Sequence, residues 1–302
     1  METEKLIRNL KRPSSKVDMI LDTDTYNEID DQFAITYMMN NPEKLNVKAI
    51  LAAPFLNPKS TSPKDGMEKS FAEIIKLLSL MGFEDMKKNV YKGSDRFLEN
   101  ESTPVTSDAS TYLADLAMHY SPDCPLYVVA IGAITNIASA ILINPKIIEN
   151  IVIIWLGGHS FHWHDTKEFN MFQDVAAARI IFGCGAPVVQ LPCKGVVSSF
   201  TISHAEIKEW LVGKNAICDY LAENTINEAS SYAKNTPWTR IVWDVTAVAW
   251  LISGDFFEER LEKSPIPEYD GYYAFNKNNH YINYVYHVHR DRLVEDLFKK
   301  IT

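Results

Sequence analysis

Carboxylates crowd one short stretch near the start of this 302-residue chain. They surround a polar turn between an apolar run and a segment of helical spacing, and they are Asp22, Asp24, Glu28, Asp30 and Asp31. Packing several carboxylates together is unfavourable unless a cation lies among them, and oxygen ligands with no thiolate nearby indicate Ca²⁺ or Mg²⁺. A simpler alternative is a solvated acidic turn that caps the helix. We favour a metal or catalytic role, because Asp22 and Asp24 directly follow a strand of the buried type.

The elements around this stretch place it at the edge of a sheet. Residues 17–21 read as a buried strand and residues 31–39 as a helix. Further strands are expected at 47–53, 89–91, 126–131, 150–156, 188–191 and 281–288. Helices are expected at 66–80, 111–120, 134–143, 175–182, 215–233, 245–251 and 291–301, with one more starting at the capping box Ser203–Glu206. This alternation predicts one α/β domain over residues 1–302, an open, mostly parallel Rossmann-like sheet with helices on both faces. Open sheets of this kind hold their sites at the carboxyl ends of the strands.

The composition excludes several classes of protein. The chain carries a net charge of −9 and no block rich in Lys or Arg, which argues against nucleic acid as a partner. Its four cysteines are isolated in the sequence, as expected in a reducing compartment. Residues 1–16 contain no apolar signal segment, and no apolar run reaches the length of a membrane span. We therefore expect a cytoplasmic protein without a membrane partner.

Five landmarks in the sequence together resemble the inosine–uridine-preferring nucleoside hydrolase family. The family's signature is an apolar strand that runs into Asp-x-Asp-Pro-Gly-x-Asp-Asp and a helix. The matching segments are residues 21–31, 130–138 (Ala-Ile-Gly-Ala-Ile-Thr-Asn-Ile-Ala), 155–158 (Trp-Leu-Gly-Gly), 168–177 and 243–244 (Trp-Asp). They occur in family order across nearly the whole chain.

The resemblance implies a Ca²⁺ site and a reaction. The Ca²⁺ ligands would be Asp24, Asp31, the main-chain carbonyl of Ile131, and Asp244. Asp24 would also take a proton from the metal-bound water, and the ribose hydroxyls would contact Asp30, Glu168 and Asn170. The expected reaction is hydrolysis of the N-glycosidic bond of a ribonucleoside or related N-riboside, through an oxocarbenium-like transition state. The resemblance also implies a homodimer or homotetramer.

Two departures from the family pattern concern the site. The Pro-Gly turn is replaced and lengthened by two residues, so five residues separate Asp24 from Asp30. Trp243 stands where several members have a histidine that protonates the departing base, and indole is no useful acid at neutral pH. Three histidines that follow the Gly157-Gly158 turn, His159, His162 and His164, could supply the missing acid, and we expect His162 or His164 in that role. The alternative is a surface loop that is rich in histidine by chance.

Other side chains are candidates for substrate contacts. They are Asn57 after the second expected strand, and Trp238 and Trp243 before Asp244. In the alternative interpretation, Asn57 is an ordinary loop residue and Trp238 fills a crevice.

Two other functions compete with the family interpretation. Asp22-Thr23-Asp24-Thr25 also fits the first motif of a haloacid-dehalogenase-like phosphatase, with Lys194 as its lysine and Asp255 as its late metal ligand. That interpretation leaves the Asp30–Asp31 pair unexplained. The replacement at Trp243 also allows a non-catalytic or altered-specificity sugar- or nucleoside-binding protein of the same fold.

Overall fold

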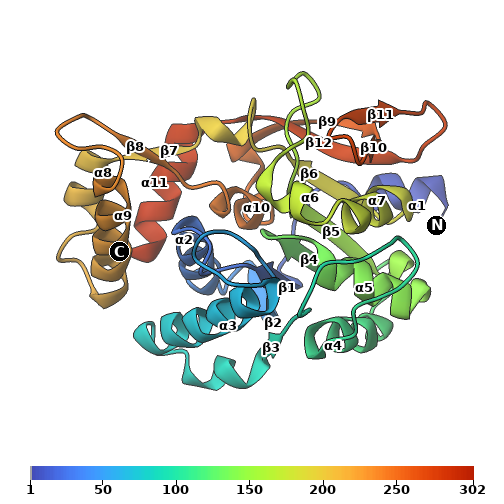
Figure 1. Cartoon of the computed structure of the whole chain (residues 1–302), viewed down its shortest axis with the longest axis horizontal. Helices are drawn as coiled ribbons and strands as arrows, with labels where there is room; N and C mark the ends of the chain where they lie inside the picture. The colour runs from blue at the N-terminus through green and yellow to red at the C-terminus, as the bar shows by residue number, and fades with distance from the viewer. Residues whose placement is uncertain (1) are drawn as a thin grey trace.

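A computed structural model describes residues 2–302 and contains an eight-stranded sheet in the order β3-β2-β1-β4-β5-β6-β12-β9 (Figure 1). The strands are β1 (Val17–Thr23), β2 (Leu45–Ala52), β3 (Val90–Lys92), β4 (Leu126–Ala130), β5 (Ile151–Leu156), β6 (Val188–Leu191), β9 (Phe257–Lys263) and β12 (Tyr281–Val288). Neighbouring strands are parallel except β12 and β9, which are antiparallel. The expected open, mostly parallel sheet is confirmed.

Both faces of the sheet are buried, as the apolar central strands require. Along β5, Val152 and Ile154 pack into the hydrophobic cluster on one face, while Ile153 and Trp155 pack into the cluster on the other. One face is covered by α2 (Asp30–Met39), α3 (Pro63–Leu80), α9 (Ala216–Ser230), α10 (Val245–Trp250) and α11 (Arg290–Ile301). The other face is covered by α4 (Asp108–Leu116), α5 (Thr135–Ile143) and α7 (Val175–Gly183).

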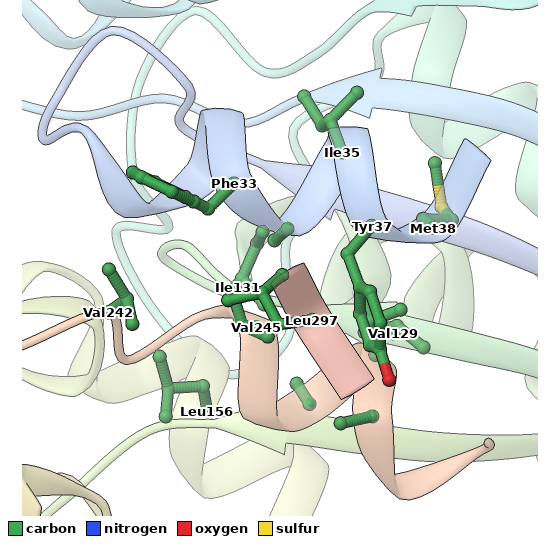
Figure 2. Packing of buried hydrophobic residues seen from close by; sticks show 14 of the residues in the cluster. Phe33, Ile35, Tyr37, Met38, Val129, Ile131, Leu156, Val242, Val245 and Leu297 are labelled. Atoms are coloured by element: carbon green, nitrogen blue, oxygen red, sulfur yellow. The ribbon is translucent and has the colours of Figure 1, made fainter. Parts of the chain in front are cut away.

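Helix α2 lies at the centre of the first of these layers. Figure 2 shows its side chains packed with Val129 and Leu156 of the sheet, Val245 of α10 and Leu297 of α11. All but the last residue of α2 are buried, so the carboxylates of its first turn, Asp30 and Asp31, are buried with it.

Several short elements were not expected from the sequence. They are α1 (Thr3–Asn9), α6 (Phe169–Gln173), β7 (Thr201–Ser203), β8 (Thr239–Ile241), β10 (Pro265–Pro267) and β11 (Tyr273–Phe275). Helix α4 begins three residues before its expected start, because Ser107 forms a capping box with Ser110. The expected capping box of Ser203 with Glu206 is present and starts α8 (His204–Trp210). No helix within residues 2–302 is long and apolar enough to cross a membrane.

The strand register sets the position of the acidic stretch. Asp22 of β1 lies opposite Ala130 of β4, and the main-chain N–H of Ile131 donates a hydrogen bond of 2.9 Å to the Asp22 carbonyl. The carboxyl ends of β1 and β4 therefore lie side by side, as the parallel sheet predicts. Helix α10 packs against α2 and brings Asp244, at its N-terminus, to the same edge.

Candidate active site

A cavity of about 290 Å³ opens at this edge of the sheet. Its walls come from the segments that follow β1, β4, β5 and β6 and from the start of α10. They are lined by Asp24, Asn27, Glu28, Asp30, Asp31, Ile131, Leu156, His159, Lys167, Glu168, Phe169, Asn170, Cys193, Lys194, Trp243 and Asp244. Most of the residues singled out in the sequence therefore meet in one place, as expected for a binding site.

Three carboxylates at one end of the cavity are close enough to share a cation. Asp30, Asp31 and Asp244 are buried, and each offers an oxygen within 4.8 Å of the others. The hydroxyl of Thr23 donates a hydrogen bond of 2.5 Å to Asp31. Burial raises the pKa of Asp31 to about 7, and burial followed by the neighbouring carboxylates raises the pKa of Asp30 and Asp244 well above the usual range. A cation in their midst would keep all three ionised at neutral pH.

Asp24 lines the same cavity, but the structure does not place it in that group of three. The expected ligand set joined Asp24 to Asp31 and Asp244, whereas the structure brings Asp30 to those two. The chain turns back after Asp24, where the N–H of Asn27 donates a hydrogen bond of 2.7 Å to its carbonyl. Asp30 and Asp31 are consecutive in the first turn of α2, and both reach Asp244.

The donor atoms fit a hard cation. Oδ2 of Asp24 and Oδ1 of Asp30 are buried without a hydrogen-bond partner, and the neighbouring side chains of Asp31 and Asp244 offer carboxylate oxygens. The thiol of Cys193 also lines the cavity, but burial raises its pKa and so keeps it from ionising to a thiolate. The carbonyl of Ile131 accepts a hydrogen bond of 3.2 Å from Nδ2 of Asn170, which leaves its second lone pair free. We conclude that this end of the cavity suits Ca²⁺ or a similar ion.

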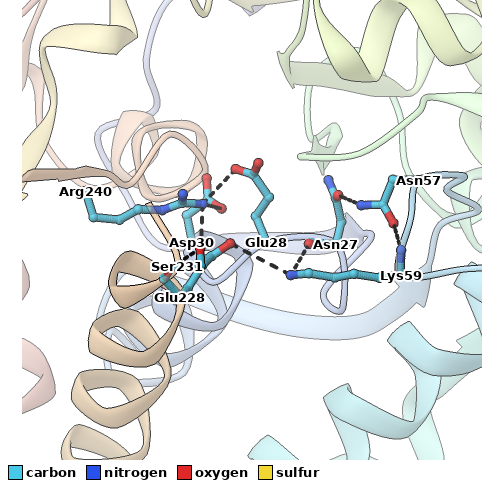
Figure 3. A network of polar contacts seen from close by, with 8 residues as sticks. All are labelled: Asn27, Glu28, Asp30, Asn57, Lys59, Glu228, Ser231 and Arg240. Atoms are coloured by element: carbon cyan, nitrogen blue, oxygen red, sulfur yellow. Dashed lines mark hydrogen bonds and ion pairs between the residues drawn. The ribbon is translucent and has the colours of Figure 1, made fainter. Parts of the chain in front are cut away.

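The turn 25–29 is held by a network of ion pairs and hydrogen bonds (Figure 3). Nη2 of Arg240, from β8, donates a hydrogen bond of 2.8 Å to Glu28 and lies 3.9 Å from Oδ1 of Asp30 and 3.7 Å from Glu228. On the other side of the turn, Nζ of Lys59 donates a hydrogen bond of 2.7 Å to the Asn27 carbonyl. Elements far apart in the sequence therefore fix this wall of the cavity.

Glu168 and Asn170 lie together on the wall after β5. Glu168 caps α6 and accepts hydrogen bonds of 2.9 Å from the N–H groups of Gly158, Asn170 and Met171. Nδ2 of Asn170 donates to the carbonyls of Ile131 and Leu156, so its Oδ1 is the atom left to accept from a ligand. Much of the Glu168 carboxylate is thus engaged in holding the loop.

Asp22 serves the fold and does not line the cavity. Its Oδ1 accepts a hydrogen bond of 2.7 Å from Nδ2 of Asn136, whose own Oδ1 accepts from the N–H and hydroxyl of Ser94. Burial raises the pKa of Asp22 to about 7. This buried network ties β1 to the start of α5 and to the loop after β3.

The histidine expectation is corrected by the structure. His162 and His164 are exposed and lie outside the cavity, whereas His159 lines it and is only 2% exposed. The reason is Phe161, which stacks on Tyr284 with ring centroids 4.3 Å apart and turns the rest of the loop toward solvent. Burial, followed by the charge of Lys194, lowers the pKa of His159 to about 4.

Asn57 and Trp238 also lie outside the cavity. Nδ2 of Asn57 donates a hydrogen bond of 2.7 Å to Asn27, which does line it, so Asn57 supports the wall. Trp238 stacks on His204 with ring centroids 4.8 Å apart and packs against the core. Trp243 lines the cavity as expected.

The phosphatase constellation is not assembled. Lys194 lines the cavity, but Asp255 is exposed in a short 3-10 helix (Gly254–Phe256) away from it. Five cavity residues had no role in the sequence-based site: Asn27, Leu156, Lys167, Phe169 and Cys193. Their positions next to predicted site residues or landmarks were the available signal, because Asn27 lies in the lengthened turn, Leu156 precedes Gly157-Gly158, and Lys167 and Phe169 flank Glu168.

Comparison with known proteins decides the family. Residues 19–292 match the sequence profile of the inosine-uridine preferring nucleoside hydrolases. The chain belongs to this family. Its members hydrolyse N-glycosidic bonds, so the chain is a hydrolase of that class, and the phosphatase alternative is set aside.

Relatives and solved structures agree with this assignment. The chain is 26% identical to the pyrimidine-specific ribonucleoside hydrolase RihA of Citrobacter koseri, over 76% of this chain and 77% of that one. It is 27% identical to the probable uridine nucleosidase 2 of Arabidopsis thaliana, over 68% and 67% of the two chains. The fold is shared with the plant nucleoside hydrolase PpNRh1, with a TM-score of 0.77, 18% identity and coverage of 95% and 99%. It is also shared with the purine-preferring ribonucleoside hydrolase of Gardnerella vaginalis, with a TM-score of 0.75, 21% identity and coverage of 94% and 98%.

Proposed function

We propose that this nucleoside hydrolase family member hydrolyses ribonucleosides or related N-ribosides in a Ca²⁺-dependent reaction. The observation that carries the proposal is the meeting of Asp30, Asp31 and Asp244 within 4.8 Å, in a cavity that Asp24 also lines. Four buried carboxylates around one cavity are tolerated when a cation and a substrate with developing positive charge complete the site.

Asp24, Asp31, Asp244 and the Ile131 carbonyl are proposed to hold the ion. When bound, Ca²⁺ would supply Lewis-acid activation of a water molecule. Asp24 is the proposed proton acceptor, because its Oδ2 is buried without a partner and faces no competing donor in the described structure. A buried carboxylate removes a proton more effectively than one in water, since burial raises its pKa.

Asp30 and Asn170 are proposed to bind the ribose hydroxyls. Oδ1 of Asp30 has no hydrogen-bond partner within the described residues, no hydrogen bond to Oδ1 of Asn170 is seen there, and the two atoms belong to two walls of one cavity. Ribose hydroxyls would donate to both. The charge of Asp30 would also stabilise the oxocarbenium-like sugar, so its contribution grows in the transition state. Glu168 is proposed to assist Asn170 from its capping position.

In this proposal the leaving group has a flat surface to lie on, and no strong acid protonates it. Trp243 offers an indole ring on which a base can lie. His159, with a pKa of about 4, is mostly neutral at pH 7 and so donates a proton poorly. We therefore expect the fastest turnover on substrates whose leaving group needs little protonation.

A screen of N-ribosides tests the proposal. Uridine, inosine and p-nitrophenyl riboside would be incubated with the protein in Ca²⁺ and, separately, in chelator, and the reducing sugar released would be measured. Release in Ca²⁺ with at least roughly 10²-fold less in chelator supports the proposal. Calorimetric binding of ribosides without any release of sugar would contradict it and would favour a binding protein.

A further inference from the structure

Lys167 and Lys194 line the cavity from the segments that follow β5 and β6. Lys194 follows β6, and Asp24 follows β1, and the strand order β1-β4-β5-β6 places three strand spacings between them. At about 4.8 Å per spacing this is roughly 14 Å across the sheet edge. We call the side of the cavity that carries Lys167 and Lys194 its basic end, and the side that carries Asp30, Asp31 and Asp244 its acidic end.

Neither lysine is neutralised by the protein. Within residues 2–302, no carboxylate lies within 4.0 Å of the ammonium group of Lys167 or Lys194, although many other lysines of the chain form such pairs. Nζ of Lys194 lies 5.8 Å from the ring centroid of Trp163, a cation–π contact that keeps it near the loop after β5. Two lysines that line one cavity without a carboxylate partner form a suitable environment for an anion.

A buried hydrogen-bond donor lies beside them. Nδ1 of His159 accepts a hydrogen bond of 3.4 Å from the main-chain N–H of Lys194, so the neutral ring carries its proton on Nε2. His159 is 2% exposed, and its Nε2 has no hydrogen-bond partner. Asp165 is the nearest carboxylate, with Oδ1 3.9 Å from Nε2, and it also lies 3.2 Å from His164. A buried N–H without a partner is unfavourable unless a ligand accepts from it.

The carboxylate of Glu168 also lines the cavity, but it repels an anion near Lys167 and Lys194 less strongly than its charge suggests. It accepts hydrogen bonds from three main-chain N–H groups, which spread and stabilise its negative charge. The free acceptor of the same wall, Oδ1 of Asn170, is the proposed ribose contact. An anionic group that extends from the ribose past Asn170 would reach Lys167, Lys194 and His159.

We propose that the substrates of this site are 5′-phosphorylated ribosides, that is, ribonucleoside 5′-monophosphates, and that Lys167, Lys194 and His159 bind the phosphate. The inference rests on the proposed function, in which Asp30 binds the ribose hydroxyls at the acidic end. C5′ is the other carbon of ribose that carries a free oxygen substituent, and it then points to the basic end. The ribose of an unmodified nucleoside has no charge at C5′ that would use two unpaired lysines, whereas a phosphate carries up to two.

The chemistry balances without a further reactant. The bond between C1′ and the base nitrogen breaks, and a bond between C1′ and the water oxygen forms. One water proton ends on the departing base, so the products are the free base and ribose 5-phosphate. The phosphate ester bond stays intact, and no inorganic phosphate is released.

The test compares each nucleoside with its own 5′-monophosphate. The kcat/KM values for uridine, uridine monophosphate, inosine and inosine monophosphate would be measured in Ca²⁺, with base release and inorganic phosphate followed in the same samples. We expect the monophosphates to be favoured by at least about 10-fold, since one charged hydrogen bond accounts for that factor. Lys167→Ala and Lys194→Ala should each reduce this preference by about 10-fold. The matched control Lys277→Ala, at an exposed position between β11 and β12, should not change it.

The outcomes separate this inference from the proposed function. Release of base from the nucleosides at rates equal to or above those of the monophosphates overturns the phosphate site and leaves the proposed function standing. If no compound releases its base, the proposed function fails. In that case, calorimetry with ribose and ribose 5-phosphate tests the phosphate site separately from catalysis. Binding of ribose 5-phosphate at least about 10-fold tighter, and lost in Lys194→Ala, supports the site, whereas equal binding overturns it.

Discussion

Arg240 and Asp30 come from opposite ends of the chain, yet Nη2 of Arg240 lies 3.9 Å from Oδ1 of Asp30. The Asp30 side chain is 3% exposed and that of Arg240 is 13% exposed, so the pair is largely shielded from water. The same guanidinium donates to Glu28 on the lengthened turn. Arg240 therefore compensates negative charge at the wall of the cavity and fixes the turn that delivers Asp30.

Replacing Arg240 should destabilise the fold. In Arg240→Met the buried Asp30 loses its neighbouring cation and Glu28 loses its hydrogen bond, which should lower the free energy of unfolding by about 1–3 kcal/mol. Urea unfolding measures this directly. The control is Arg260→Met, because Arg260 is 52% exposed and pairs with Glu262 on the surface, and it should change stability by no more than about 0.5 kcal/mol. Equal effects of the two substitutions would contradict the role of Arg240.

Asp30→Asn should separate sugar binding from metal binding. It keeps the shape of the side chain but removes the charge that stabilises the cationic sugar, so kcat/KM on ribosides should fall by at least roughly 10²-fold. Ca²⁺ binding measured by calorimetry should persist. The control Asp255→Asn alters an exposed carboxylate outside the cavity and should leave both quantities unchanged. Loss of Ca²⁺ binding in Asp30→Asn would instead make Asp30 a metal ligand, in line with its place beside Asp31 and Asp244.

Stability without Ca²⁺ should depend on pH. The pKa of Asp31 is about 7 in the folded chain because of burial, against about 3.9 when unfolded. Between these values the folded state holds a proton that the unfolded state has released. The contribution of the Asp31 proton to the stability of the folded state is therefore fully present below about pH 4, and it is lost as the pH rises through about 7.

The corresponding measurement is thermal unfolding of chelated protein at pH 5 and pH 8, each repeated with added Ca²⁺. The chelated protein should have the lower Tm at pH 8, and Ca²⁺ should raise Tm more at pH 8, where the ligands are ionised. In Asp244→Asn, added Ca²⁺ should no longer raise Tm. A Ca²⁺ effect of the same size at both pH values would speak against the acidic cluster as the site.

The exposed histidines should be dispensable for cleavage. The double variant His162→Ala/His164→Ala should retain inosine hydrolysis within about two-fold, because both side chains are exposed and neither lines the cavity. Turnover of inosine and of p-nitrophenyl riboside would be measured side by side. A loss of roughly 10²-fold or more on inosine, with p-nitrophenyl riboside unaffected, would instead show that one of them protonates the leaving group.

The sequence was sufficient for the features that depend on local pattern. The apolar run of β1 ends at the carboxylates that line the cavity, and the alternating residues of β12 form the strand expected at 281–288. Strand β9 was missed because it lies at the edge of the sheet and carries charged residues such as Glu259 and Arg260, so it lacks an apolar pattern. Helix α1 was missed for a similar reason, since Leu6 is its one buried large apolar residue.

The site itself could be predicted only in part. Asp244 meets Asp31 because α10 packs on α2, and it was placed there by family resemblance rather than by spacing. The pairing of Arg240 with Glu28 joins residues 212 positions apart and leaves no local signal. The choice between His159 and its neighbours depends on Phe161, whose packing against Tyr284 cannot be read from the loop sequence.

A Ca²⁺ titration of chelated protein tests whether cleavage of ribosides depends on one Ca²⁺ bound in the cavity. Ca²⁺ bound per chain and the initial rate of sugar release from the best riboside or its 5′-monophosphate would be followed over the same additions. The expected result is one Ca²⁺ per chain, with a rate that rises from near zero in proportion to occupancy. A full rate in metal-free protein, or no sugar released when the site is saturated with Ca²⁺, would contradict the claim.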